Sequence, residues 1–137
     1  MKLLLDTHTF LWAASGDERL PASVSALLAS NEHQLLVSVA SLWEIVIKAA
    51  AGQQLRWSTP KGIGELETWV HRMGAEILPI HASHAIGTWY FREWTHKDPF
   101  DRMLATQSIT ERATLVTADT ALQSRPGLKW VWDPVPS

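Results

Sequence analysis

The chain has 137 residues, of which 46% are hydrophobic and 19% are charged. This is an ordinary globular composition, and the length predicts a single domain over residues 1–137 that is large enough to bury a core. The formal net charge is −2, so the chain lacks the basic excess that lets a protein bind nucleic acid over a broad surface. Any contact with nucleic acid is therefore expected to be local.

Cysteine is absent, which excludes disulfides, thiolate metal sites and a cysteine nucleophile, and fits a reducing compartment. The opening "MKLLLD" has three apolar residues before an acid, too few for the core of a signal peptide, and no later run approaches the length of a membrane span. We predict a cytoplasmic protein that makes no use of a membrane.

Short apolar runs alternate along the chain with segments of helical spacing. The runs cover 2–6, 34–40, 75–80, 113–119 and 128–134, and the helical segments cover 7–15, 21–30, 41–52, 62–74, 81–94 and 98–112. Short continuous apolar runs are typical of strands buried on both faces, and their alternation with helices favours a parallel sheet. The predicted fold class is α/β, a three-layer α/β/α domain with a central, mostly parallel sheet.

The stretch 49–62, "AAAGQQLRWSTPKG", is interpreted as a loop between helices and not as a domain linker, because periodic segments flank it. We find no internal repeat. The glycine-rich phosphate loops "GxGxxG" and "GxxxxGK" are missing as well, which disfavours dinucleotide-binding and P-loop functions.

Acidic residues recur just beyond the predicted strands. Asp6 ends the first strand, Glu44 is expected in the first turn of the helix after the second, and Asp119 ends the fourth. Asp98 and Asp101 begin a later helix. Because ligands of open α/β sheets bind beyond the carboxyl ends of the strands, these acids are the first candidates for a functional site.

Each acid also has a purely structural explanation. Ser41 and Glu44 match a capping box, in which the glutamate returns to the serine amide. Asp98 before Pro99 is suited to the N-cap of a helix. Asp101 would then be the third helical residue, where a negative charge favours the helix dipole. Solvated strand ends would account for the remaining two acids.

As a group, the acids are harder to explain by purely structural roles, because the topology places several strand ends at the same edge of the sheet. Four carboxylates there repel one another unless protons or a cation intervene. Oxygen ligands without cysteine suit Mg²⁺ or Mn²⁺. Such ions activate water and stabilise charge in phosphodiester cleavage, singly or as a pair.

Four segments in order carry a resemblance to a known family: "LLLDTHTFLW", "SVASLWEIVIK", "HKDPFDRMLATQS" and "LVTAD". With these segments the chain resembles the PIN-domain ribonucleases, and within them the VapC-type toxins of type II toxin–antitoxin systems, over nearly its whole length. The resemblance implies a metal-dependent endoribonuclease that hydrolyses RNA with metal-activated water. It also implies a homodimer and a cognate antitoxin protein.

The resemblance assigns roles to particular acids. It implies an acidic quartet around one or two Mg²⁺ or Mn²⁺ ions, made of Asp6, Glu44, Asp101 and Asp119. Asp6 and Asp101 would hold the principal ion, Glu44 would orient water or a second ion, and Asp119 would act directly or through water. "DRMLATQS" matches the family pattern that follows the third acid, which favours Asp101 over Asp98.

Two further residues are secondary site candidates. Asp98 is expected mainly to cap its helix while staying within reach of a metal through water, and Thr7 is expected to orient Asp6 by a hydrogen bond. The cations available for phosphates are scattered, namely Lys48, Lys97, Arg92, Arg102 and Arg112. We therefore do not expect tight, nonspecific RNA binding.

The histidines and the aromatic residues leave alternatives open. His81 and His84 are predicted to lie on a helix surface and not to bind metal, whereas His8 and His96 adjoin site acids and are candidates for contacting substrate or positioning an acid. Trp12 and Trp43 are predicted in the core or an interface. The dense cluster Trp89, Tyr90, Phe91 and Trp94 predicts a surface that a partner covers, since aromatics favour protein interfaces and stack on single-stranded bases.

Two rival functions fit part of the pattern. A haloacid-dehalogenase-like phosphatase also places an aspartate after the first strand, but its second aspartate, two residues on, is His8 here. A non-catalytic protein-binding module would use the acids only as helix caps. Metal binding separates the latter from both enzymes.

Overall fold

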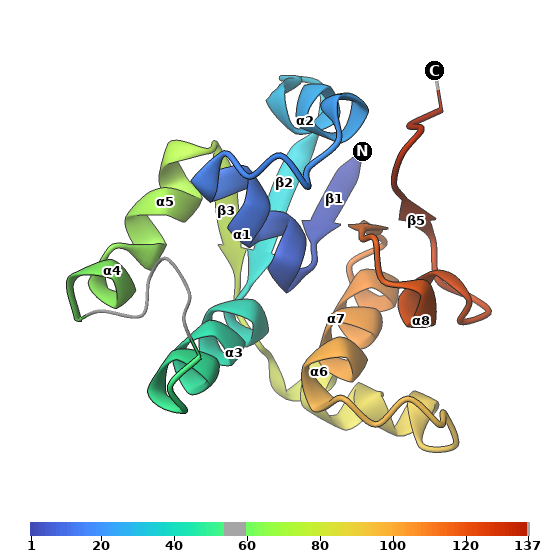
Figure 1. Ribbon diagram of the computed structural model, residues 1–137. Coiled ribbons are helices and arrows are strands. Elements are labelled where there is room, and N and C mark those ends of the chain that lie inside the picture. The colour runs from blue at the N-terminus through green and yellow to red at the C-terminus, as the bar shows by residue number, and fades with distance from the viewer. Residues whose placement is uncertain (54–59, 137) are drawn as a thin grey trace.

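A computed structural model describes residues 1–53 and 60–136, and Figure 1 shows a central sheet with helices on both sides. The strands are β1 (Lys2–Leu5), β2 (Gln34–Ser38), β3 (Ala75–Leu78), β4 (Thr114–Val116) and β5 (Trp130–Val131). Their order is β3-β2-β1-β4-β5, and every neighbouring pair is parallel. The predicted three-layer α/β/α fold is confirmed.

The helices follow the predicted segments with some interruptions. They are α1 (Thr7–Ser15), α2 (Ala22–Ala29), α3 (Val39–Ala50), α4 (Pro60–Gly64), α5 (Leu66–Arg72), α6 (Ala82–Gly87), the 3-10 helix η1 (Thr88–Phe91), α7 (Pro99–Thr110) and α8 (Thr120–Gln123). The continuous helices expected over 62–74 and 81–94 are each divided in two. Residues 54–59 of the loop expected over 49–62 lie outside the described residues, and the two ends of that stretch belong to α3 and α4.

Gly87 lies where the predicted 81–94 helix changes from α6 to η1. A Cβ atom at this position would come within 3.0 Å of Thr106 Cγ2 on α7. The glycine therefore lets the α6–η1 segment pack closely on α7, which carries one of the candidate acids.

The last two strands are shorter than the apolar runs that predicted them. β4 spans 114–116 within the run 113–119, and β5 spans only 130–131 within 128–134. β5 lies at the edge of the sheet and pairs with β4 alone. Asp119 consequently does not end a strand: it caps α8, a helix that the sequence patterns did not predict.

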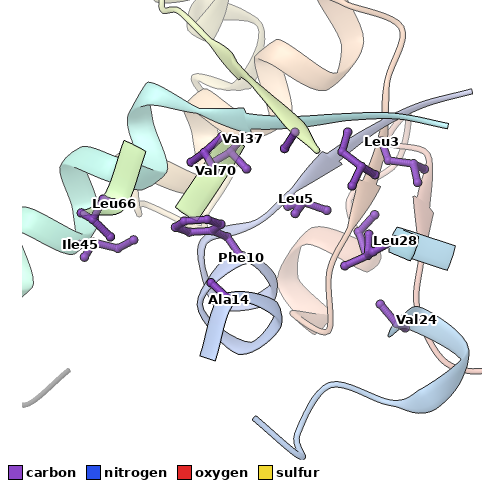
Figure 2. Close-up of a cluster of buried hydrophobic side chains, with 13 residues drawn as sticks. Leu3, Leu5, Phe10, Ala14, Val24, Leu28, Val37, Ile45, Leu66 and Val70 are labelled. Atoms are coloured by element: carbon purple, nitrogen blue, oxygen red, sulfur yellow. The ribbon is translucent and has the colours of Figure 1, made fainter. Parts of the chain in front are cut away.

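The core lies on both faces of the sheet, as alternating side chains of the buried strands require. Leu3 and Leu5 of β1 pack with Phe10 and other residues of α1, α2, α3 and α5 in the cluster drawn in Figure 2. Leu4, between them, packs on the opposite face with Leu104 of α7. All three leucines of β1 are 0% exposed. The continuous apolar run therefore marks a strand that is buried on both faces.

The chain order reverses around β1. From β1 the chain adds β2 and then β3 on one side, and β4 and β5 on the other. The backbone amide of Asp6 donates to Val116 O at 3.2 Å, which holds the ends of β1 and β4 together. Ligand sites of open α/β sheets lie at such a reversal, beyond the carboxyl ends of the strands. None of the described helices is long and apolar enough to cross a membrane.

Candidate metal centre and active site

Asp6 stands at the reversal, directly after β1, and caps α1. One carboxylate oxygen, Oδ1, accepts from the backbone amide of Thr9 at 2.8 Å, and the other, Oδ2, accepts from Thr117 Oγ1 at 2.5 Å. The side chain is buried, and its desolvation raises the pKa of Asp6 above the usual value while the bonds from Thr117 and Thr9 act in the opposite direction. The carboxylate is therefore held by the first turn of α1 and by the residue that follows β4.

Glu44 lies deeper in its helix than the sequence predicted. Ser38 caps α3, because its hydroxyl accepts from the amide of Ala40 at 3.0 Å, and the helix begins at Val39. Ser41 is thus a buried helical residue and Glu44 lies in the second turn, so the capping-box interpretation is wrong. The helix begins earlier because Ser38, the last residue of β2, is itself a good capping residue.

The carboxylate of Glu44 is bonded at both oxygens. Thr7 Oγ1 donates to Oε1 at 2.6 Å and also lies 3.0 Å from Ser41 Oγ, while Lys48 Nζ donates to Oε2 at 2.6 Å. Thr7, which was expected to orient Asp6, instead orients Glu44. Lys48, four residues on along α3, balances the charge of Glu44 from the edge of the site.

Asp98 and Asp101 make different contacts at the start of α7. Asp98 Oδ1 accepts from the amides of Phe100 at 2.9 Å and Asp101 at 3.1 Å, so the predicted cap is confirmed, with Pro99 as the first helical residue. The carboxylate of Asp101 instead faces His96, whose Nε2 lies 2.7 Å from Asp101 Oδ2.

Asp101 is crowded by other acids. Burial is the main reason that the pKa of Asp101 is raised to about 6; the charges of Asp98 and Asp119 also raise it, and the hydrogen bond from His96 lowers it. A carboxyl group in this position is short of compensating positive charge, which a proton or a metal ion can supply.

Asp119 enters the site from the loop after β4. Its Oδ1 accepts from the amide of Ala121 at 2.8 Å, and its own amide donates to Thr117 Oγ1 at 3.0 Å. The same threonine hydroxyl bonds Asp6. Thr117 therefore links two site acids, and sequence analysis missed it, although it is one of two threonines in the mainly apolar run before Asp119.

All six predicted site residues meet in one cavity of about 170 Å³. Its lining is Asp6, Thr7, His8, Glu44, Lys48, His96, Asp98, Asp101 and Asp119. One ligand atom each from His96, Asp101 and Asp119 lies within 4.8 Å of the others, the spacing of a group that can share a metal ion. A second cavity, of about 330 Å³, also touches Asp6 and Asp119 and extends the crevice to Trp12 and Arg19.

The cations proposed for phosphate binding do not gather here. Lys48 lines the cavity. Arg102 is used within the fold, since its Nε donates to His96 O at 2.9 Å and its Nη2 to Trp94 O at 2.5 Å. Arg92 lies over the ring of Trp89, 4.9 Å from its centroid. The site is acidic with a single lysine among its lining residues.

The other histidine and aromatic predictions met mixed outcomes. His84 is fully buried and its Nε2 lies 3.0 Å from Glu111 Oε2, so a surface position was wrong for it, whereas His81 is exposed. The reason is that His84 Nδ1 accepts from the His81 amide and caps α6 from inside. Phe91 is also buried, whereas Trp43, Trp89 and Tyr90 are 59%, 70% and 62% exposed.

Comparison with known proteins identifies the family. A family model for the PIN domain matches residues 3–128. No curated protein matches the chain.

Three solved structures of similar fold are VapBC complexes. The chain is similar to one in VapBC2 from Rickettsia felis bound to a promoter DNA fragment, with 22% identity, a TM-score of 0.72, and coverage of 97% of this chain and 100% of that one. It is also similar to a chain in DNA-bound VapBC from Salmonella typhimurium, with 21% identity, a TM-score of 0.70, and coverage of 96% of this chain and 97% of that one. A chain in VapBC-1 from nontypeable Haemophilus influenzae shares 19% identity with a TM-score of 0.69, and the match covers 96% of this chain and 97% of that one. The match over residues 3–128 spans nearly all of the sheet and the whole acidic cavity, and the chain belongs to the PIN-domain family.

Proposed function

We propose that this protein is a divalent-metal-dependent endoribonuclease that acts in the cytoplasm as the toxin of a toxin–antitoxin pair. The observation that carries the proposal is the convergence of Asp6, Glu44, Asp101 and Asp119 in one cavity at the β1–β4 reversal. Membership of the PIN family and the shared fold with chains of VapBC complexes support it.

The donor set fits a hard divalent ion. Asp101 and Asp119 offer carboxylate oxygens within 4.8 Å of each other and of His96, and Asp6 lines the same cavity. Mg²⁺ and Mn²⁺ prefer such oxygens and keep several waters. Burial first, and then the charges of Asp98 and Asp119, raise the pKa of Asp101, and a bound cation could take the place of its proton.

The proposed roles follow from these contacts. Asp6, Asp101 and Asp119 would hold the ion, with Asp6 kept rigid by Thr117 and Thr9. A bound divalent ion would supply a water of lowered pKa and stabilise the charge that develops on the RNA phosphate.

Glu44 would take part from the far side of the cavity. Both of its oxygens are already bonded, to Thr7 and Lys48, so its carboxylate is fixed in a position where it could accept a further hydrogen bond from water. A second ion at Glu44 would require Lys48 to leave. Lys48 in its present position would instead attract the substrate phosphate, and Asp98 would remain a helix cap.

Two rival functions were considered, a haloacid-dehalogenase-like phosphatase and a metal-free binding module. Membership of the PIN family replaces the haloacid-dehalogenase hypothesis, whose second aspartate is absent. A metal-free binding module predicts no Mn²⁺ binding by the purified protein. Calorimetry with Mn²⁺ therefore separates it from the proposed enzyme.

RNA cleavage tests the enzyme directly. Purified protein should cleave RNA with Mg²⁺ or Mn²⁺, and both excess EDTA and Asp101→Asn should abolish cleavage. Asp133→Asn is the matched control, because Asp133 is an exposed aspartate that does not line the cavity and accepts a hydrogen bond from Ser23 Oγ. Cleavage that continues undiminished in EDTA, after contaminating nucleases are excluded, would disprove the metal mechanism.

Expression in a bacterial host tests the toxin role. The wild-type protein should arrest growth, Asp6→Asn should relieve the arrest at equal protein yield, and co-expression of the antitoxin from a neighbouring reading frame should also relieve it. Arrest that persists with Asp6→Asn would indicate another mode of action.

A further inference from the structure

We propose that His96 is a nitrogen ligand of the metal ion and biases the site toward first-row transition ions over Mg²⁺. The inference rests on the proposed function, since it concerns the same ion. The imidazole of His96 would add a nitrogen donor to the four carboxylates, and this donor would change which ions the site prefers.

The separations among the donor atoms fit ligands of one ion. His96 Nε2 lies 2.7 Å from Asp101 Oδ2. One ring nitrogen of His96 and one carboxylate oxygen each of Asp101 and Asp119 lie within 4.8 Å of one another. In an octahedral shell with bonds of about 2.1 Å, adjacent ligands are about 3 Å apart and opposite ligands about 4.2 Å. The three atoms therefore need only small movements to share an ion.

The imidazole is held in position before any ion binds. Arg102, the residue after Asp101 on α7, donates to the backbone carbonyls of His96 and Trp94. The ring of His96 also packs against the ring of Trp94, with centroids 5.1 Å apart. The helix that carries Asp101 thus also fixes the loop that carries His96, so the two donors form one preorganised pair.

The pair is placed so that other ligands can join. The side chains of His96 and Asp101 are 28% and 18% exposed, at the rim of the cavity. Water or a phosphate oxygen can therefore complete the shell, as in metal sites that keep open positions for substrate.

The alternative role for His96 is a hydrogen bond to Asp101 that only orients the carboxylate. The two roles differ in how they depend on the ion. An imidazole ligand favours Ni²⁺ and other later transition ions, whereas Mg²⁺ strongly prefers oxygen. An orienting hydrogen bond stabilises Asp101 for every ion alike.

Calorimetry on untagged protein with Ni²⁺ and Mg²⁺ as separate probes distinguishes these roles. His96→Gln should weaken Ni²⁺ binding by at least about tenfold and Mg²⁺ binding by less than about threefold. His71→Gln, an exposed histidine on α5, is the matched control for adventitious imidazole sites. Equal losses for both ions, or no loss for Ni²⁺, would overturn the proposal.

A spectroscopic measurement checks ligation itself. Pulsed electron paramagnetic resonance of the Mn²⁺-loaded protein should show coupling to an imidazole ¹⁴N that disappears in His96→Gln and persists in His71→Gln. If Asp101→Asn abolishes Mn²⁺ binding but wild type shows no such coupling, the His96 proposal fails alone. If wild type binds no ion that depends on Asp101, both proposals fail.

Discussion

At the scale of single residues, Glu44 is the acid whose role the structure changes most. It is buried, far from the helix N-terminus, and bonded by Thr7 and Lys48. In a capping box, Glu44 would bond only to the start of its own helix. The observed bond from Thr7 instead joins α1 to α3, beside the other acids. Glu44 therefore lines the cavity as an ion pair with Lys48.

Glu44→Gln tests this role. The amide oxygen can still accept from Thr7, but the ion pair with Lys48 is lost. We expect a small loss of stability, a smaller rise in melting temperature on adding Mn²⁺, and at least tenfold slower RNA cleavage. Glu67→Gln, an exposed glutamate on α5, should behave as wild type. An unchanged Mn²⁺ response with unimpaired cleavage would remove Glu44 from the site.

The raised pKa values of Asp6 and Asp101 predict a pH dependence of metal binding. Asp101 has a pKa of about 6 in the folded protein without metal, above its usual value of 3.8. The folded state therefore favours the protonated acid, so the metal-free protein loses stability as pH rises from 3.8 through 6, and the loss is complete above 6.

A metal ion must displace this proton. At pH 5 most Asp101 is protonated, so the apparent Mn²⁺ affinity should fall about tenfold relative to pH 7.5. The rise in melting temperature on adding Mn²⁺ should accordingly be larger at pH 7.5 than at pH 5, with metal-free protein measured at both pH values as the reference. Equal rises at the two pH values would contradict the raised pKa.

At the scale of elements, a buried hydrogen-bond bridge sets the spacing of the two helices that carry Glu44 and Asp101. Gln107 of α7 is 0% exposed; its Oε1 accepts from Ser38 Oγ at 2.6 Å, and its Nε2 donates to Pro79 O at 3.2 Å. Ser38 is also the N-cap of α3. The bridge therefore joins the start of α3 to the middle of α7.

Gln107→Leu tests the bridge. It leaves the buried Ser38 hydroxyl and Pro79 carbonyl without this partner, which should cost about 1–3 kcal/mol in chemical denaturation. Gln34→Leu, at an exposed glutamine of β2, should change stability by less than about 0.5 kcal/mol.

Combining Gln107→Leu with Ser38→Ala should cost less than the sum of the two single changes, because both remove the same bond. Additive losses would indicate that the bridge contributes nothing to stability.

At the scale of the whole molecule, large apolar side chains remain exposed on two surfaces. One is the outer face of α3, with Val39, Trp43, Val46 and Ile47, and the other is the α6–η1 segment, with Ile86, Trp89 and Tyr90. Exposed groups of apolar residues mark interaction surfaces. The proposed homodimer and the antitoxin are the partners that we expect to cover them.

Light scattering tests this expectation. Wild-type protein should have twice the chain mass of 15.3 kDa, or should change mass when the neighbouring gene's product is added. Trp43→Ser and Trp89→Ser, each at an exposed tryptophan, should show which surface is responsible. A monomer that does not respond to the added protein would refute both partners.

The sequence determined the fold class and identified the acids that line the cavity. The alternation of short apolar runs with helical segments depends on local periodicity, and a parallel sheet then follows from the connections between strands. Because carboxyl ends of parallel strands share one edge, Asp6, Glu44, Asp119 and the pair Asp98 and Asp101 were predicted to lie near one another. The resemblance to the PIN-domain ribonucleases favoured Asp101 within that pair. The cap at Asp98 was also predictable, since its bonds reach only two and three residues along the chain.

Only the tertiary structure decided which residue contacts which acid. Thr117 bonds Asp6 across 111 positions and Thr7 bonds Glu44 across 37, and no local pattern encodes such pairings. The start of α3 was mispredicted because Ser38 and Ser41 are both acceptable caps, and it is Ser38 that ends β2 where Gln107 bonds it. Chain periodicity encodes which face of an element is apolar, whereas the partners of a buried polar group depend on how distant elements pack.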